Sequence, residues 1–489
     1  MTGLGTADQV VVVGGGITGL TAAHRLIRSG RAPESVALIE GSSHLGGKVR
    51  TDQTDGFLVE AGPDSFVTNK GAVLELAEEL GISDRVISSR AEHRGAQVWS
   101  RGRLHPIPDG LLLMAPSRLS PLLRSTLFSV RGKARILADL VIPRGRSEGD
   151  VSLEEFVVRR FGREMLDRLA EPLVAGIHAA EPPHMSLAAS FPRFLDMERT
   201  HRSLILAARA ATRRQSGGAG TGLSYFASFR EGMGELTGAL VTHLRGVHFE
   251  TEKAVTRLEI ANAPGTAGRF RLTLSDGSQV EAAGVILAVP AEQTAALLSR
   301  IVPGVAPLVA GIRQVTTATV TLAFQRGDLP GLEGSGFVVP AAERRRIMGV
   351  SYLSRKWEGR VDDEGTDLLR GFVGGSAGQD LAMAGEDRLV ALVRAELAEI
   401  LGVTANPLMT RAKTWVGGLH QYNVGHVERV AAVEAEVATF PRLALAGAAF
   451  HGIGLNECVR SGRRAADQVI GALSSRSSAI AGVDSGRSR

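Results

Sequence analysis

A β-branched run that ends in three glycines lies near the start of the chain: Gln9-Val10-Val11-Val12-Val13-Gly14-Gly15-Gly16-Ile17-Thr18-Gly19. Leu20 to Ser29 follow with the spacing of a helix, and the second strand-like run, Ser35 to Ile39, ends at Glu40. Strand, glycine turn, helix and strand in this order predict a βαβ unit of a parallel sheet.

The glycine turn and the acid that follows it predict a dinucleotide site. In the pattern G-x-G-x-x-G, Gly14 permits the tight turn, Gly16 lets the backbone approach a pyrophosphate, and Gly19 lets the helix touch the strand. The phosphates would then lie at the positive end of the helix. Glu40 would accept hydrogen bonds from the ribose hydroxyl groups. Its negative charge would repel a 2′-phosphate, so a nucleotide without that phosphate is favoured. A glycine motif alone is weak, but this one has its full strand and helix context.

Length and composition narrow the class of protein. The 489 residues suggest two or three domains at about 100–200 residues each, and 44% apolar with 22% charged residues excludes wholesale disorder. Cys458 stands alone, so no intramolecular disulfide forms, and a reducing, cytoplasmic location is expected. No spacing of His, Cys or carboxylates matches a metal site.

The net charge of +5 comes from basic residues that are interspersed with acids, and aromatic residues make up only 4%. This pattern predicts no nucleic-acid partner and suits a small anionic ligand. No apolar run reaches the ~18 residues of a membrane-spanning helix, and the chain begins without a cleavable leader. Residues 111–142 alternate apolar clusters with Arg and Lys, which suggests either a peripheral contact with an anionic membrane or a packed helix pair with a solvated basic face.

A second glycine segment follows Glu40, with Gly41, Gly46-Gly47-Lys48 and then Gly62-Pro63-Asp64-Ser65. It resembles the second glycine motif of the glutathione-reductase-like flavoproteins, specifically the flavin amine oxidase superfamily. That superfamily carries Arg where this chain has Lys48. Without the resemblance, the glycine pair before Lys48 could be a simple turn.

Over residues 9–472 the chain resembles the porphyrinogen oxidases of haem synthesis. The matching stretches are Leu104 to Pro108, Glu171 to Ala179, Glu198 to Ile205, Gln421 to His426, and Ala446-Gly447 with Gly452 to Leu455. The resemblance implies removal of six electrons from a porphyrinogen by way of FAD, with dioxygen as the final acceptor and peroxide as its product. Gly46-Gly47-Lys48, Gly62 to Phe66 and Lys70 look closest to the branch of many monoderm bacteria, which forms coproporphyrin III from coproporphyrinogen III. The other branch acts on protoporphyrinogen IX.

The resemblance also implies an α/β fold. We expect a glutathione-reductase-like FAD-binding Rossmann domain with a β-rich substrate domain and an inserted helical region. The FAD-binding parts would be residues 1–75, 224–295 and 426–473, and the substrate domain 296–425. Residues 76–223 would form the mainly helical insertion with part of the substrate domain, and 474–489 a disordered tail. The glycine-rich segment 214–222 reads as an internal linker.

The matching positions assign a set of cofactor-binding residues. They are Gly14, Gly15, Gly16, Ile17, Thr18, Gly19, Glu40, Gly41, Gly47, Lys48, Gly62, Pro63, Asp64, Ser65, Val255, Trp415, Gly447, Ile453, Gly454 and Leu455. Val255 matches the position that meets the adenine, and Trp415 a flavin-side aromatic. Taken without the resemblance, both would be ordinary core residues.

The same matching assigns Lys70, Gly176, Ile177 and His178 to the substrate. Gly176 would permit the close approach that hydride transfer needs. Lys70 is a candidate for a substrate propionate, as are Arg94 and Arg202, for which plain solvation is the alternative. No catalytic acid or base is assigned, because the redox chemistry belongs to the cofactor.

Two other functions remain open from the sequence. One is an amine oxidase or a carotenoid-type desaturase on the same fold, although few aromatics are available for an amine cage. The other is a protein that binds a porphyrin without catalysis and transfers it to a ferrochelatase-type partner.

Overall fold

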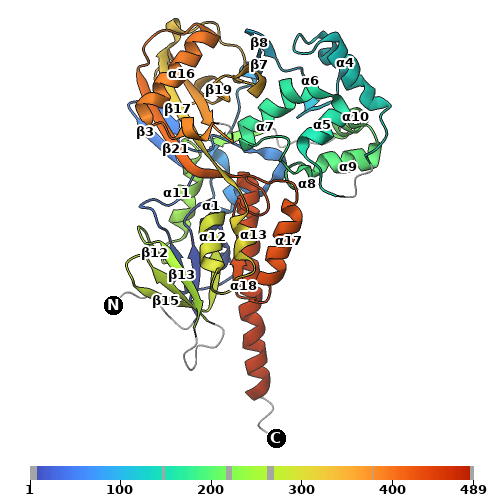
Figure 1. Cartoon of the computed structure of the whole chain (residues 1–489). Helices are drawn as coiled ribbons and strands as arrows, with labels where there is room; N and C mark the ends of the chain where they lie inside the picture. Colours follow the sequence, from blue (N-terminus) through green and yellow to red (C-terminus); the bar gives the residue numbers. More distant parts are fainter. Residues whose placement is uncertain (1–7, 146–148, 216–222, 262–268, 377, 485–489) are drawn as a thin grey trace.

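The computed structural model describes residues 8–145, 149–215, 223–261, 269–376 and 378–484 (Figure 1). Three bodies are visible. The first, at the bottom of the view, carries both described ends of the chain, the second contains the strands around α16, and the third contains the helices from α4 to α10.

A five-stranded parallel sheet forms the centre of the first body. Its order is β12 (His248–Glu250), β2 (Val36–Ile39), β1 (Val10–Val13), β16 (Gly284–Leu287) and β22 (Leu443–Leu445). The expected βαβ unit is present as β1, α1 (Ile17–Arg28) and β2. Since the five strands come from distant parts of the chain, the sheet closes only when these parts assemble.

The four valines of β1 explain why the sheet is covered on both faces. Alternate side chains of a strand point to opposite faces. Val10 and Val12 pack into the core that contains α1, α2 (Ala72–Glu79), α11 (Gly234–His243) and α18 (Leu455–Asp484). Val11 and Val13 pack into the core on the other face. That face is covered by β13 (Val255–Ile260), β14 (Phe270–Leu274), β15 (Gln279–Ala282), α12 (Ala291–Leu298), α13 (Ala306–Ala310) and α17 (His426–Val437).

A seven-stranded sheet forms the second body. Its order is β21 (Met409–His420), β17 (Gln314–Gln325), β20 (Thr366–Gly374), β19 (Gly349–Tyr352), β18 (Gly336–Val338), β7 (Gln97–Ser100) and β8 (Arg103–Pro106). Helix α16 (Glu386–Leu401) contributes Leu389, Val393 and Leu397 to the core of this sheet. The short helices α14 (Leu353–Lys356) and α15 (Gln379–Ala382) also contact β20.

Small β-structures connect the two sheets. They are the hairpin β3 (Thr51–Thr54) and β4 (Phe57–Glu60), and the three-stranded sheet of β5 (Phe66–Val67), β11 (Phe226–Phe229) and β6 (Val86–Ser88). Trp357 lies fully buried in a core that joins β4 to β17 and β20. The hairpin therefore fixes the segment that follows Glu60 between the two bodies.

The third body is helical and has its own core, which includes Phe156, Phe161 and Leu169. Its helices are α3 (Leu119–Arg124), α4 (Val130–Leu137), α5 (Leu153–Phe161), α6 (Arg163–Met165), α7 (Glu171–His178), α8 (Leu187–Ser190), α9 (Pro192–His201) and α10 (Leu204–Gln215). Residues 97–116 lie within the region expected to be mainly helical with part of the substrate domain, and they form β7, β8 and the small hairpin β9 (Leu111–Leu112) and β10 (Ala115–Pro116). These residues form strands because β7 pairs with the distant β18, while β7 with β8 and β9 with β10 pair as hairpins.

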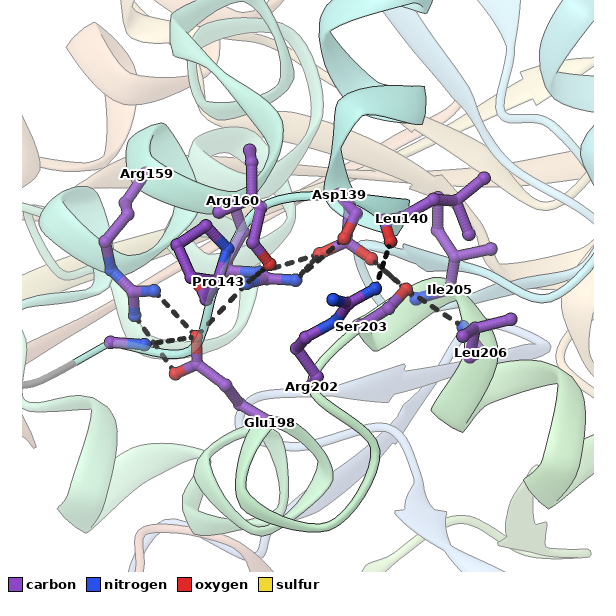
Figure 2. Close-up of polar contacts among 12 residues, drawn as sticks. Asp139, Leu140, Pro143, Arg159, Arg160, Glu198, Arg202, Ser203, Ile205 and Leu206 are labelled. Atoms are coloured by element: carbon purple, nitrogen blue, oxygen red, sulfur yellow. Dashed lines mark hydrogen bonds and ion pairs between the residues drawn. The ribbon is translucent and has the colours of Figure 1, made fainter.

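A buried ionic network holds the helical body together (Figure 2). Arg160 and Asp139 are both fully buried, and the Arg160 Nε donates to Asp139 Oδ1 at 2.6 Å. The other oxygen of Asp139 accepts from Ser203 Oγ at 2.6 Å and from the Ile205 backbone N–H at 3.0 Å, which caps α10. Glu198 on α9 accepts from both Arg159 and Arg160. These contacts fasten the turn between α9 and α10 to α5.

The carboxyl-terminal helix corrects one expectation. Residues 474–489 were expected to be a disordered tail, but α18 continues through Asp484 and projects from the first body (Figure 1). The segment contains no proline that would end the helix, although its serines and Gly482 are weaker helix formers than alanine. Most of the expected linker, residues 216–222, lies outside the described residues.

Candidate functional site

The glycine turn lies at the carboxyl end of β1. Gly14 has φ +107°, and a Cβ there would come within 2.5 Å of the carbonyl oxygen of Ala288. A Cβ on Gly19 would overlap the carbonyl oxygen of Gly14. By contrast, a Cβ on Gly16 would meet nothing within 4 Å. Gly14 and Gly19 are therefore needed for packing, and Gly16 faces open space.

The start of α1 is prepared for an anion. Gly16 is its N-cap, no side chain caps it, and its first turn contains no acidic residue. The first backbone N–H groups of a helix lack partners within the helix and carry its positive end. Phosphate oxygens are suitable acceptors for such groups.

Glu40 lies beside this turn. Its Oε2 accepts the Gly15 backbone N–H at 2.7 Å, and its Oε1 accepts the Ser42 N–H at 2.8 Å. A carboxylate has further acceptor positions, which remain for a ribose. The chain before β13 lies alongside, since the Lys253 N–H donates to the Glu40 carbonyl oxygen at 3.1 Å. This contact brings Val255, the first residue of β13, to the same edge of the sheet.

The second glycine segment folds onto the first. The Gly46 N–H donates to the Gly15 carbonyl oxygen at 2.8 Å, and a Cβ on Gly47 would lie 3.1 Å from Gly16 Cα. A Cβ on Gly62 would overlap the carbonyl oxygen of Lys48. The glycines at 15–16 and 46–47 therefore lie in contact at the end of β1, and Gly62 packs next to them against Lys48.

Lys48 and Trp415 connect these glycine segments to β21 of the seven-stranded sheet. The Lys48 ammonium donates to the carbonyl oxygen of Gly418, and burial lowers the pKa of Lys48. Trp415 Nε1 donates to the Ala61 carbonyl oxygen at 2.7 Å. The first contact joins β21 to Lys48, which is predicted to lie along the flavin, and the second joins β21 to Ala61, directly before the predicted residues 62–65.

Asp64 is the anionic centre of a buried ionic cluster. Its Oδ2 accepts from Lys356 Nζ at 2.8 Å and from Trp357 Nε1 at 3.2 Å. Burial alone would raise the pKa of Asp64, but the charges of Lys356 and Arg370 hold it well below its usual range. Arg370, on β20, donates to the Gly62 carbonyl oxygen at 2.6 Å. These cations fix residues 62–64 through the Asp64 carboxylate and the Gly62 carbonyl oxygen, and no local sequence signal marked them.

The carboxyl-terminal residues complete the edge of the sheet. Gly447 follows β22 with φ +116°, a Cβ there would meet nothing within 4 Å, and its N–H donates to Ser461 Oγ at 3.0 Å. Ile453 and Gly454 lead directly into α18, which begins at Leu455 and packs along α1. The three glycine-rich turns, at Gly14 to Gly19, at Gly46-Gly47 and at Gly447, thus all lie at the same edge of the parallel sheet, where the strands end.

The predicted substrate residues lie on and near α7. Gly176 and Ile177 are exposed, and the nearest neighbour of a Cβ on Gly176 would be Val338 at 3.8 Å. The Gln421 side chain donates to the His178 carbonyl oxygen at 2.9 Å, which ties the end of α7 to the chain after β21. Burial, assisted by the charge of Lys70, lowers the pKa of His178 to about 4, so its ring is neutral at physiological pH.

Lys70 itself pairs with Glu457 at 2.7 Å, in the first turn of α18. Its charge therefore lies close to both the α18 terminus and His178. Arg202, in contrast, donates to the Leu140 carbonyl oxygen in the helical network of Figure 2, so the site does not include it.

His420 is a residue that the sequence analysis missed. It ends β21, it is 4% exposed, and its Nδ1 has no hydrogen-bond partner among the described residues. Its position directly before the matching stretch Gln421 to His426 was the one available signal.

The model of the family "Flavin containing amine oxidoreductase" matches residues 17–470 of this sequence. The chain belongs to this family. It is an FAD-dependent oxidase, and its fold is the expected α/β architecture with an FAD-binding domain and a substrate domain.

Among the relatives of this oxidase, the coproporphyrinogen III oxidase of Propionibacterium freudenreichii subsp. freudenreichii is 37% identical over 95% of this chain and 91% of its own length. The coproporphyrinogen III oxidase of Bacillus subtilis is 30% identical over 94% and 98%. A crystal structure described as a putative protoporphyrinogen oxidase from Exiguobacterium is similar with a TM-score of 0.83 at 30% identity, covering 95% of this chain and 99% of that one.

The residues of the oxidase fit FAD. Gly16 and Gly447 leave open space at the carboxyl ends of the strands, and the start of α1 at Gly16 carries neither a side-chain cap nor an acidic residue in its first turn. Glu40 would hold the ribose, and Lys48 with residues 62–65 would lie along the flavin.

Two further observations concern the described part of the oxidase. None of its described helices is long and apolar enough to cross a membrane. Among the same residues, no three or more His, Cys, Asp or Glu side chains are arranged to hold a metal ion.

Proposed function

We propose that this oxidase converts coproporphyrinogen III to coproporphyrin III in haem biosynthesis, with dioxygen as the electron acceptor. The observation that carries the proposal is the 37% identity, over nearly the full length of both chains, to the coproporphyrinogen III oxidase of Propionibacterium freudenreichii. The oxidation of a porphyrinogen needs a flavin and a large surface beside it, and it needs no acid–base triad. The site is in keeping with this requirement.

The balance of the reaction sets what the protein must do. The macrocycle loses six electrons and six protons, and three dioxygen molecules take them up as three molecules of hydrogen peroxide. Bound FAD would supply the two-electron acceptor of each step. The chain itself has to hold the macrocycle close to the flavin and keep bulk water out. The absence of a side chain at Gly176 would permit such an approach, since hydride transfer requires about 3–3.5 Å between the reacting atoms.

His178, on α7, has a pKa too low for it to take up a proton from the substrate at physiological pH. His178 is neutral at physiological pH because burial lowers its pKa to about 4. A neutral imidazole can accept a hydrogen bond from a pyrrole N–H, but with its pKa lowered to about 4 it is too weak a base to keep the proton at physiological pH. The protons would therefore leave to solvent.

Charge is the proposed basis of substrate preference. Coproporphyrinogen carries four carboxylates and protoporphyrinogen two, so cations around the macrocycle favour the former. Lys70 lies at the entrance to α18 with its ammonium on Glu457, and its side chain is half exposed. We expect it to meet a propionate when substrate binds.

Protoporphyrinogen IX is the second candidate substrate. The protoporphyrinogen oxidase of Bos taurus is 31% identical over 94% of this chain and 98% of its own length. This identity is close to that of the Bacillus subtilis relative, and the macrocycles react at the same ring positions.

Purified protein tests the proposal directly. Mixed in air with chemically reduced coproporphyrinogen III, it should form fluorescent porphyrin and peroxide well above the rate of autoxidation. Equal rates with and without protein would refute the activity. A higher kcat/KM for protoporphyrinogen IX than for coproporphyrinogen III would reverse the assigned preference.

Two partner interactions extend the proposal. Leu123, Val130 and Val141 are exposed among basic residues of the helical body, a combination that suits an anionic membrane surface. Binding to vesicles that contain phosphatidylglycerol, and not to neutral vesicles, would support this contact.

Direct transfer of product to a ferrochelatase-type partner would appear as product delivery that an excess of added porphyrin-binding protein does not intercept.

A further inference from the structure

Glu457 is a carboxylate that two cations share in the first turn of α18. Its Oε1 lies 2.7 Å from Lys70 Nζ and 3.4 Å from a terminal nitrogen of Arg460. The Arg460 guanidinium also donates to the Lys70 carbonyl oxygen. The side chains of Lys70 and Arg460 are each 48% exposed, whereas that of Glu457 is 16% exposed. Both cations are therefore accessible to a ligand, and Glu457 is the enclosed member of the triad.

The backbone that carries this triad is held by Asn456, which is 1% exposed. Its side-chain amide donates to the Val67 carbonyl oxygen at 2.9 Å, and its side-chain oxygen accepts the Val73 N–H at 3.0 Å. These contacts fasten the first turn of α18 to both sides of the short turn η2 (Thr68–Lys70). A change of partner by Lys70 therefore needs movement of its side chain alone.

The triad lies beside the residues predicted for substrate and flavin. Burial, and secondly the charge of Lys70, lowers the pKa of His178 on α7, so the ammonium lies near that ring. Glu457 packs against the glycines that lead into α18, because a Cβ on Gly454 would lie 2.5 Å from Glu457 Oε2. Lys70 thus has a predicted substrate residue and the predicted flavin segment as neighbours.

Charge balance determines what the triad binds. Lys70 and Arg460 carry two positive charges and Glu457 carries one negative charge, so one positive charge remains for an external anion. A carboxylate suits both cations, because an ammonium has three N–H donors and a guanidinium presents its donors in a planar fork. Such a ligand must share Lys70 with Glu457, whose like charge also repels it.

We propose that Lys70 and Arg460 form a binding site for a carboxylate of the macrocyclic substrate, and that Glu457 is an internal carboxylate that competes for them. The inference rests on the proposed function, since coproporphyrinogen supplies the carboxylates. It adds Arg460 and Glu457 to the residues that set substrate affinity. On this account Glu457 weakens the binding of macrocycles that carry carboxylates and has no effect on the corresponding ester.

Binding of the product, rather than turnover, tests the site. The dissociation constant of coproporphyrin III would be measured with FAD-loaded protein from the change in porphyrin fluorescence. The tetramethyl ester of coproporphyrin III, in the same dilute detergent, offers the same ring without the carboxylates. Glu75→Gln is the control for net charge, because Glu75 pairs with Arg463 of α18 and not with Lys70 or Arg460.

We expect Glu457→Gln to bind coproporphyrin III about three- to tenfold more tightly than the wild type, because a like charge near the ligand is removed. Its affinity for the ester should stay within about twofold of the wild-type value, as should that of Glu75→Gln for both compounds. Unchanged or weaker binding of coproporphyrin III by Glu457→Gln would overturn the proposal. An equal gain for the ester, or in Glu75→Gln, would overturn it as well.

Arg460→Gln tests the second cation and covers the case in which Glu457→Gln does not fold. Since the Arg460 side chain is half exposed, its replacement should leave the fold intact. We expect this variant to bind coproporphyrin III about threefold or more weakly, with little change for the ester. Equal affinities of Arg460→Gln and the wild type for coproporphyrin III would overturn the assigned site.

A mutant cycle separates competition for the cations from simple repulsion. In a chain that carries both Lys70→Gln and Arg460→Gln, the further change Glu457→Gln should alter the affinity by less than about twofold, because no cation is left to share. A gain as large as that in the wild-type background would show that Glu457 only repels the ligand, and it would overturn the proposal.

The same measurements distinguish a failure of this inference from a failure of the proposed function. Wild-type protein that does not bind coproporphyrin III would refute the proposed function and this inference with it. Wild-type protein that binds coproporphyrin III, together with a folded Glu457→Gln variant that binds it no more tightly, would refute the competition by Glu457 alone.

Discussion

The Glu40 carboxylate accepts the backbone N–H of Gly15 at 2.7 Å, across 25 residues of sequence. This hydrogen bond joins the end of β2 to the glycine turn after β1. A single side chain therefore shapes the glycine turn, and it is the side chain that we expect to hold the ribose of FAD.

Replacing Glu40 by Ala should weaken FAD binding by about tenfold or more, because hydrogen bonds to a charged group contribute about 1.5–3 kcal/mol each. Titration of the apoprotein with FAD provides the measurement. Glu34→Ala is the matched control, since Glu34 is an exposed carboxylate just before β2. Equal dissociation constants for Glu40→Ala and the wild type would contradict the assigned role.

Replacing Gly19 by Ala should destabilise the fold by more than about 3 kcal/mol or prevent folding, because the new Cβ would overlap the Gly14 carbonyl oxygen. Gly238→Ala, on the exposed side of α11, is the control. A Cβ there meets nothing within 4 Å, so the change should be neutral or stabilising by up to about 1 kcal/mol. Urea unfolding compares the two, and similar midpoints for both variants would refute the prediction.

Replacing Asp139 by Ala should cost about 3–5 kcal/mol, since Arg160 would remain buried without its main partner (Figure 2). The pair of Asp196 and Arg199, at 3.7 Å and largely exposed, supplies the control. Asp196→Ala should change the free energy of unfolding by less than about 1 kcal/mol. A loss of under about 1 kcal/mol in Asp139→Ala would show that the network is not structural.

Glu60 predicts a specific dependence of stability on pH. It is 1% exposed, and burial raises its pKa to about 7 despite hydrogen bonds from Met233 and Thr51. The folded protein therefore binds a proton that the unfolded chain releases near its ordinary pKa of about 4.3. Stability should fall as the pH rises from about 4 to about 7 and then level off.

Glu60→Gln should remove this dependence, so its free energy of unfolding relative to wild type should rise by about 3 kcal/mol between pH 5 and pH 8. Denaturant titrations at several pH values measure it, with Glu34→Gln as the control for an exposed carboxylate. A constant difference between wild type and Glu60→Gln over this range would exclude the raised pKa.

Gly176→Leu should lower kcat/KM for the porphyrinogen by about a hundredfold while FAD binding stays unchanged, since a large side chain would hold the macrocycle away from the flavin. The backbone of Gly176 is exposed and has room for a side chain, so the variant should fold. Gly304→Leu, at another open position, controls for the added leucine. An unaltered kcat/KM in Gly176→Leu would remove α7 from the substrate site.

Some features were predictable because their determinants are local. The valine run of β1, the strand β2 and the glycine turn between them carry their structure in adjacent residues, and the structure has them where the sequence predicted. The exact strands within residues 97–116 could not be placed from the sequence, because β7 pairs with β18 far along the chain. Lys356 and Arg370 gave no local signal either, since only the packing of two sheets brings them to Asp64 and Gly62.

The claim that the oxidase acts on coproporphyrinogen III is tested most directly by mixing the FAD-loaded protein with that compound without oxygen. We predict that the visible absorbance of oxidised flavin bleaches at a rate that rises with substrate concentration, and faster than with protoporphyrinogen IX at equal concentration. Flavin that remains oxidised with coproporphyrinogen III, in a preparation that dithionite still reduces, would contradict the account.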